Sequence, residues 1–192
     1  MTTTPSPTLH PAPWYTRIAA RWPTGLALAM STLLAGGAGT DDGTLLFAGI
    51  LPLLPLLYLV VATLERRRAT WPLLAAGFAV VFVLRGLDLI SPGVVFWAVA
   101  LVVLVWNTAG GRVWRDARLR AQAVGMLVFG GLGLAGLVLD PDVGRYLVAA
   151  GWFLHGVWDV VHLRRNLVVA RSFAEWCAVV DVVVAVALVL QL

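Results

Sequence analysis

The chain has 192 residues, of which 60% are hydrophobic and only 12% are charged. Its mean hydropathy of +0.90 is far above that of an ordinary soluble domain. The net charge of +4 comes from arginines in short clusters between apolar runs, as in loops at a membrane surface. We therefore expect the lipid bilayer, and no nucleic acid, as a partner. Because the chain has no lysine, chemistry through a lysine Schiff base is excluded.

The first residues differ in composition from the rest of the chain. Residues 1–16 are rich in threonine and proline, and they lack the basic start and short apolar core of a cleaved signal peptide. We expect a disordered polar tail here, followed by a single transmembrane helical domain over residues 17–192.

Seven apolar runs follow, most of them close to the 20 residues that span a bilayer as a helix. They predict an all-α, polytopic integral membrane protein with about seven transmembrane helices. The fourth run is the shortest, since 15 residues at 1.5 Å each cover only about 22 Å, and a re-entrant hairpin with the third is the alternative. The runs are residues 22–38, 45–64, 71–90, 92–106, 121–139, 144–162 and 173–192.

The arginines predict the orientation of these spans. If the spans alternate in direction, the arginine clusters near residues 17–21, 66–68, 112–120 and 164–171 all fall on one side. An excess of arginine marks the cytoplasmic side, so we expect a cytoplasmic N-terminus and an external C-terminus in the plasma (inner) membrane. The opposite loops carry Asp41, Asp42, Asp140 and Asp142 against Arg145.

Two stretches of the chain resemble each other weakly. Each runs from a glycine-rich helix through an acidic turn into a helix closed by arginines, so that residues 22–90 would match residues 121–192. With the fourth span as connector, this pattern predicts a 3+1+3 plan of two parallel repeats.

Small residues at helical spacing indicate close contacts between helices. Gly131 and Ala135 lie four residues apart in the fifth span, and Gly36, Gly37 and Gly39 cluster at the end of the first. In membranes such residues let helix backbones approach, so we expect packing here rather than function.

The sixth span, GWFLHGVWDVVH, holds the most informative polar residues. At 100° per residue His155, Asp159 and His162 share one face of the helix, flanked by Trp152 and Trp158. Ionisable residues inside a membrane are costly and usually mark a pathway, a relay or a catalytic site.

The seventh span adds a second polar pair, because Cys177 and Asp181 are four residues apart. Counted inward from the arginines, His155 and Asp181 both lie about 14 to 15 Å deep, and Asp159 is level with Cys177. The short connection predicts that the two helices are antiparallel neighbours with a polar pocket between them, open toward the cytoplasm.

These residues favour a small membrane enzyme that acts on a lipid or isoprenoid substrate by acid–base chemistry. The candidate catalytic residues are His155, Asp159 and Asp181, with Trp152, Trp158 and Cys177 as candidate substrate-binding residues. A proton-coupled or small-solute transporter and a non-catalytic membrane subunit are the alternatives.

A metal ion is a further hypothesis for the same face. Histidine and aspartate are ordinary ligands of zinc and iron, and one ion can join Asp159 to either His155 or His162. The two histidines are seven residues, or about 10.5 Å, apart along the axis, so one ion reaches all three side chains only with strain.

Overall fold

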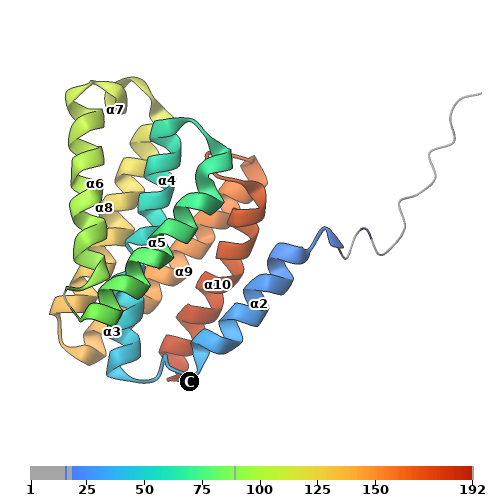
Figure 1. Ribbon diagram of the computed structural model, residues 1–192, viewed down its shortest axis with the longest axis vertical. Helices are drawn as coiled ribbons and strands as arrows, with labels where there is room; N and C mark the ends of the chain where they lie inside the picture. Colours follow the sequence, from blue (N-terminus) through green and yellow to red (C-terminus); the bar gives the residue numbers. More distant parts are fainter. Residues whose placement is uncertain (1–15, 17–18, 89, 192) are drawn as a thin grey trace, which may run out of the picture.

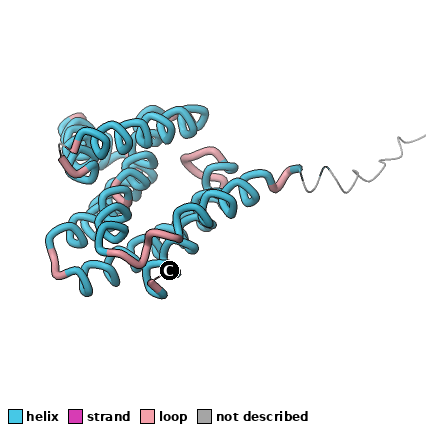
Figure 2. Tube along the Cα trace, turned by 60° about the horizontal axis from the view of Figure 1, so that its bottom comes forward, coloured by secondary structure: helices cyan, strands magenta, loops and turns pink. Residues whose placement is uncertain are grey.

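The computed structural model describes residues 16, 19–88 and 90–191, without the side chains of residues 33 and 35. In these ranges every regular element is a helix (Figures 1 and 2), which confirms the predicted all-α fold. Apart from residue 16, the predicted polar tail lies outside the described residues. In chain order the elements are α2 Trp22–Ala35, α3 Asp41–Ile50, α4 Leu53–Leu64, the 3₁₀ turn η1 Arg67–Ala69, α5 Thr70–Leu87, α6 Pro92–Ala109, α7 Arg112–Arg115, α8 Ala117–Val138, α9 Pro141–Arg165 and α10 Arg171–Leu190.

Five segments are long and apolar enough to cross a membrane. They are Asp41–Leu64, Arg67–Leu87, Pro92–Ala109, Ala117–Val138 and Arg171–Leu190. The fourth predicted span is thus longer than expected, because α6 continues to Ala109 as an 18-residue helix. The other two predicted spans are also helices, but each lacks one property of a membrane span. α2 has only 14 residues, and α9 has 25 residues but carries polar groups along its length. For these two, crossing the membrane stays a prediction.

The second predicted span consists of two helices, α3 and α4. Pro52 and Pro55 have no backbone N–H, so the hydrogen-bond ladder is interrupted where α3 ends and α4 begins. The two pieces stay nearly continuous because Leu51 still bonds back to Phe47. α4 is buried along most of its length and lies in the interior, behind α5 in Figure 1.

The basic connections meet at one end of the bundle, the upper end in Figure 1. Arg67 donates to the side chain and the backbone carbonyl of Asn166, joining the α4–α5 connection to the α9–α10 connection. Arg112 donates to the carbonyl of Thr63 at 2.9 Å, which adds the α6–α8 connection. The fold therefore separates its basic connections from the acidic turns at the starts of α3 and α9.

The two acidic turns that indicated a repeat both cap the first turn of a helix. Thr40 accepts from the backbone N–H of Gly43 at the start of α3, and Asp140 accepts from that of Asp142 at the start of α9. Both side chains satisfy N–H groups that a helix leaves unpaired at its first turn. The 3+1+3 plan itself stays a prediction.

Of the glycines that we expected to pack closely, Gly39 does so, since a Cβ there would lie 2.5 Å from the carbonyl oxygen of Gln191, and the others do not. A Cβ at Gly131, Gly36 or Gly37 would meet nothing within 4 Å, so these glycines face open space. The close approach of α8 to α3 instead occurs at Gly133, where a Cβ would lie 2.9 Å from the carbonyl oxygen of Ala48. A shift of one or two residues turns a helical side chain by 100° or 200° around the axis. In a glycine-rich run, the spacing of small residues therefore does not determine which glycine faces the neighbouring helix.

The helices α9 and α10 are antiparallel neighbours, as predicted from their short connection. α10 lies along α9 on one side and along α2 on the other, while α4 packs against α8 (Figure 1). This arrangement brings the polar faces of α9 and α10 into the interior, next to α4.

Candidate functional site

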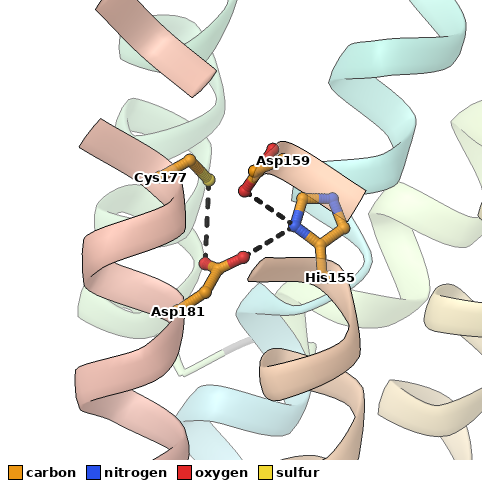
Figure 3. A group of neighbouring side chains, drawn as sticks. All are labelled: His155, Asp159, Cys177 and Asp181. Carbon is orange, nitrogen blue, oxygen red and sulfur yellow. Dashed lines mark hydrogen bonds and ion pairs between the residues drawn. The ribbon is translucent and has the colours of Figure 1, made fainter. Parts of the chain in front are cut away.

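Four side chains from α9 and α10 form a polar cluster in the interior (Figure 3). His155 and Asp159 are one turn apart on α9, and Cys177 and Asp181 are one turn apart on α10. None of the four is exposed. We call these residues the α9–α10 centre.

The imidazole of His155 lies between the two carboxylates. Its Nδ1 is 2.7 Å from Oδ2 of Asp181 and 3.3 Å from Oδ2 of Asp159. The thiol of Cys177 donates to Oδ1 of Asp181 at 3.7 Å. The predicted levels of these residues are confirmed, because antiparallel helices bring His155 opposite Asp181 and Asp159 opposite Cys177.

A glycine allows the two helices to approach at this point. A Cβ on Gly156 would lie 3.1 Å from Cβ of Asp181 and 3.5 Å from the carbonyl oxygen of Ala178. A side chain there would push α10 away from α9 and lengthen the distance from His155 to Asp181.

Tyr58 of α4 completes the cluster from a third helix. Its hydroxyl donates a hydrogen bond to Oδ1 of Asp159, and its ring packs edge-on against those of His155 and His162. This bond holds one oxygen of Asp159 on α4 and leaves the other directed toward His155.

His162 does not join the centre, although it shares the polar face of α9. Its Nδ1 is 2.9 Å from the carbonyl oxygen of Trp158, which can only accept, so we assign the hydrogen of the neutral ring to Nδ1. Its Nε2 then accepts from the amide of Gln122 at 3.2 Å. Both ring nitrogens are therefore engaged, and His162 is bound to α8. The residues that join His155 and Asp159 in the centre are Cys177 and Asp181 instead of the predicted His162.

The two tryptophans of α9 have different surroundings. Trp152 is buried and donates from Nε1 to the carbonyl oxygen of Phe47 at 3.2 Å. Trp158 is partly buried and packs against the rings of Phe129 and His162, on the α8 side of α9. Of the two predicted substrate-binding aromatics, Trp152 lines a cavity next to the centre and Trp158 does not.

That cavity has a volume of about 20 Å³, roughly the space of one water molecule. Asp181 and Cys177 lie in its wall, and the rest of the wall is apolar. Four helices besides α9 and α10 contribute to it: α2, α3, α4 and α5. The lining residues are Met30, Leu34, Phe47, Ile50, Leu54, Phe78, Trp152, Trp176, Cys177, Val180 and Asp181.

The predicted opening of the polar pocket toward the basic end is not present. The centre is fully covered, because α4 and its Tyr58 side chain close the space above Asp159. The cleft at the basic end is separate, with a volume of about 320 Å³ between α4, α8 and the α9–α10 connection. Sequence spacing placed the polar residues on two helices, but it did not show that a third helix covers them.

The centre holds two buried carboxylates with one imidazole between them. No arginine is paired with either carboxylate in the part of the chain that the structure describes. His155 Nε2 and Asp159 Oδ2 are both buried without a hydrogen-bond partner, although Oδ2 lies 3.3 Å from Nδ1 of His155. A group of this kind is costly unless it binds protons or a cation, so its presence indicates more than helix packing.

Sequence reasoning missed Tyr58 and Gln122. Tyr58 lies eight residues, or about 12 Å, before Arg66, so the depth count that matched α9 to α10 would have placed it near the same level. The face of α4 that meets α9 could not be deduced, because the two hydroxyl residues of α4, Tyr58 and Thr63, lie on different faces of an otherwise apolar helix.

Comparisons with protein families, with curated proteins and with solved structures found no match. The fold and the centre by themselves define a helical protein with five segments that are long and apolar enough to cross a membrane, and with a buried His, Asp and Cys cluster between two of its helices.

Proposed function

We propose that the protein is a small membrane enzyme that carries out acid–base chemistry on a lipidic substrate at the α9–α10 centre. The observation that carries this proposal is the apolar cavity with Asp181 and Cys177 in its wall, next to the hydrogen bond between Asp181 and His155. Binding sites for apolar molecules are typically apolar, with a few polar groups that orient the ligand.

The proposed roles follow from position. Asp181 lines the cavity. It exchanges a proton with the substrate, and His155 exchanges it with Asp181 across their 2.7 Å contact. Asp159 orients His155 and is itself held by Tyr58. Trp152 and Cys177 contact the substrate in the cavity, whereas His162 and Trp158 position α8 against α9.

The substrate enters from the side, between α2 and α5. Met30 and Leu34 of α2 and Phe78 of α5 line the cavity and are only partly buried. A ligand of lipid size needs some 300 Å³ or more, so the cavity must widen by an order of magnitude. We expect α2 to move outward and widen the cavity, because α2 packs mainly against a single helix, α10.

The enzyme has seven spans, with α2 and α9 crossing in addition to the five apolar helices. α9 has 25 residues, about 37 Å, and its polar face is covered by α10, α8 and the Tyr58 side chain of α4. The basic end faces the cytoplasm and the acidic end faces outward in the plasma (inner) membrane.

Proton-coupled transport is the second candidate, and the chain of contacts from Tyr58 through Asp159 and His155 to Asp181 favours it. Linked donors and acceptors of this kind make proton relays in pumps and transporters. Such a relay needs no space for a lipid.

Lipid turnover tests the first candidate against the second. The purified protein is placed in nanodiscs made from a total lipid extract with added isoprenoid alcohols, and the lipids are followed by mass spectrometry. We expect conversion that is lost in Asp181→Asn and retained in Asp88→Asn, a matched change at an exposed carboxylate outside the centre. Unchanged lipids, together with proton flux through proteoliposomes that Asp181→Asn abolishes, would replace the enzyme with the transporter.

A further inference from the structure

We infer that His155, Asp159, Cys177 and Asp181 bind one divalent transition-metal ion of the zinc class. Each residue offers one ligand atom, and the four atoms lie within 4.8 Å of one another. The inference concerns the centre of the proposed enzyme, but ion binding is independent of any reaction and rests on the proposed function only for the ion's use.

The donor types fit such an ion. One imidazole nitrogen, two carboxylate oxygens and one sulfur are ordinary ligands of zinc, and four is its usual coordination number. The sulfur excludes magnesium and calcium, which prefer oxygen ligands alone.

The spacing in the sequence also fits. His155 with Asp159, and Cys177 with Asp181, are i, i+4 pairs on facing sides of two antiparallel helices. Each pair projects from one helix face, so the four donors surround a common point (Figure 3).

The distances between donors need only small changes to accept the ion. Bonds of 2.0 to 2.3 Å at tetrahedral angles place neighbouring donors roughly 3.4 Å apart. His155 Nδ1 is 3.3 Å from Asp159 and 2.7 Å from Asp181, so the second contact must lengthen. In that contact the ion replaces the hydrogen that Nδ1 shares with the carboxylate. The most distant donors, up to 4.8 Å apart, must move closer by roughly 1 Å.

Charge balance favours a dication. Two carboxylates lie fully buried with no arginine paired to them in the described ranges, and a single imidazolium would neutralise only one. One divalent ion neutralises both carboxylates, and coordination by Cys177 as a thiolate then leaves a net charge of −1 on the centre. Binding releases the Nδ1 proton of an imidazolium, and the thiol proton of Cys177 when sulfur coordinates, to solvent.

A second layer of contacts holds the ligands in place. The hydroxyl of Tyr58 donates to Oδ1 of Asp159 and so directs Oδ2 toward the ion. Gly156 allows α10 to approach α9 at Asp181. The adjoining cavity, about the size of one water, lies beside Cys177 and Asp181, where a ligand position could open.

Cobalt titration tests the inference with a readout independent of activity. The full chain in nanodiscs is stripped with a chelator, and Co²⁺ is added while the absorption spectrum is recorded. We expect intense visible bands of tetrahedral cobalt together with a near-ultraviolet thiolate-to-cobalt charge-transfer band, and Zn²⁺ should displace both.

The variants separate the ligands from their surroundings. Cys177→Ser should lose the charge-transfer band and keep the visible bands, and Asp181→Asn should weaken binding at least tenfold. His162→Gln and Asp88→Asn should bind as the original chain does, because neither residue belongs to the centre. Size-exclusion profiles show whether each variant remains folded.

A folded original chain that gives no tetrahedral cobalt spectrum would overturn the inference, as would a spectrum that Cys177→Ser and Asp181→Asn both leave unchanged. Either result leaves the proposed enzyme standing if lipid turnover still depends on Asp181. Cobalt binding with the expected spectrum but without lipid turnover has the opposite meaning: the metal centre stands and the proposed enzyme fails.

Discussion

The hydroxyl of Tyr58 makes the hydrogen bond that links α4 to a carboxylate of α9. It donates to Oδ1 of Asp159, and both residues are almost completely buried. In an interior without water, an oxygen that loses its donor gains no replacement, so the cost of deletion exceeds the net strength of the bond.

Tyr58→Phe therefore leaves a buried carboxylate oxygen unpaired, and we expect a loss of about 1–3 kcal/mol of unfolding free energy. Tyr146→Phe is the matched control, since Tyr146 is 55% exposed. Denaturation in mixed micelles measures both. Equal stability of Tyr58→Phe and the original chain would mean that the bond to Asp159 is absent.

Two buried tryptophans line the same cavity but differ in one hydrogen bond. Trp152 donates to the carbonyl of Phe47, whereas Nε1 of Trp176 has no partner. We expect Trp152→Phe to lower the free energy of unfolding by about 0.5–1.5 kcal/mol more than Trp176→Phe does. The second substitution costs less because it removes a donor that has no acceptor. The same denaturation assay compares them, and the reverse order would contradict the hydrogen-bond assignment.

The sequence allowed the residues of the centre to be predicted only in part. His155, Asp159 and Asp181 could be found because charge is rare in an apolar helix, and their common depth follows from helix rise. Tyr58 could not, because the other hydroxyl of α4, on Thr63, points about 140° away around the helix, so the two define no polar face. His162 shares the face of His155, but its depth sets it beside Gln122, and helical periodicity does not show which neighbour covers each turn.

At the scale of the helices, contacts between backbones decide which small residues matter. Gly131 and Gly133 are two positions apart in α8, yet only Gly133 meets α3 and the proline that starts α4. Hydropathy located the apolar segments, but α3 and α9 begin four and three residues before the predicted runs, because Thr40 and Asp140 cap them. The facing sides of α8 and α3 could not be deduced from the sequence, because glycine-rich helices have no apolar stripe to orient them.

Gly133→Ala should destabilise the protein by about 1–3 kcal/mol. The added methyl group would lie 2.9 Å from the backbone oxygen of Ala48, and relieving this clash requires a shift of the helix backbone. Gly131→Ala should be neutral or stabilise by up to about 1 kcal/mol through helix propensity. Denaturation midpoints of the two variants provide the comparison. A loss at Gly131 with none at Gly133 would place the α8 contact on the other side of the helix.

At the scale of the whole molecule, the separation of charge between the two ends is the feature that the sequence predicted best. The short connections between apolar runs determine which arginines gather, and the contacts of Arg67 and Arg112 join those connections. The closed interior was the feature predicted worst, since it depends on α4 covering α9 and α10.

Cysteine labelling in intact cells tests the orientation. The native Cys177 is fully buried and serves as an unreactive background. A membrane-impermeant maleimide should label Asp42→Cys at the acidic end and leave Ala117→Cys at the basic end unlabelled until the cells are permeabilised. Labelling of Ala117→Cys alone in intact cells would reverse the proposed topology.

The enzyme, the relay and the metal site all require that α9 and α10 join His155 to Asp181 inside the bundle. The coupling free energy between these two residues measures that requirement most directly, from the unfolding free energies of His155→Gln, Asp181→Asn and the double variant. We predict a coupling of about 1.5–3 kcal/mol, because the 2.7 Å contact between two fully buried groups exists only when both are intact. Effects that add to within about 0.5 kcal/mol would show that the residues do not meet, and would contradict the centre itself.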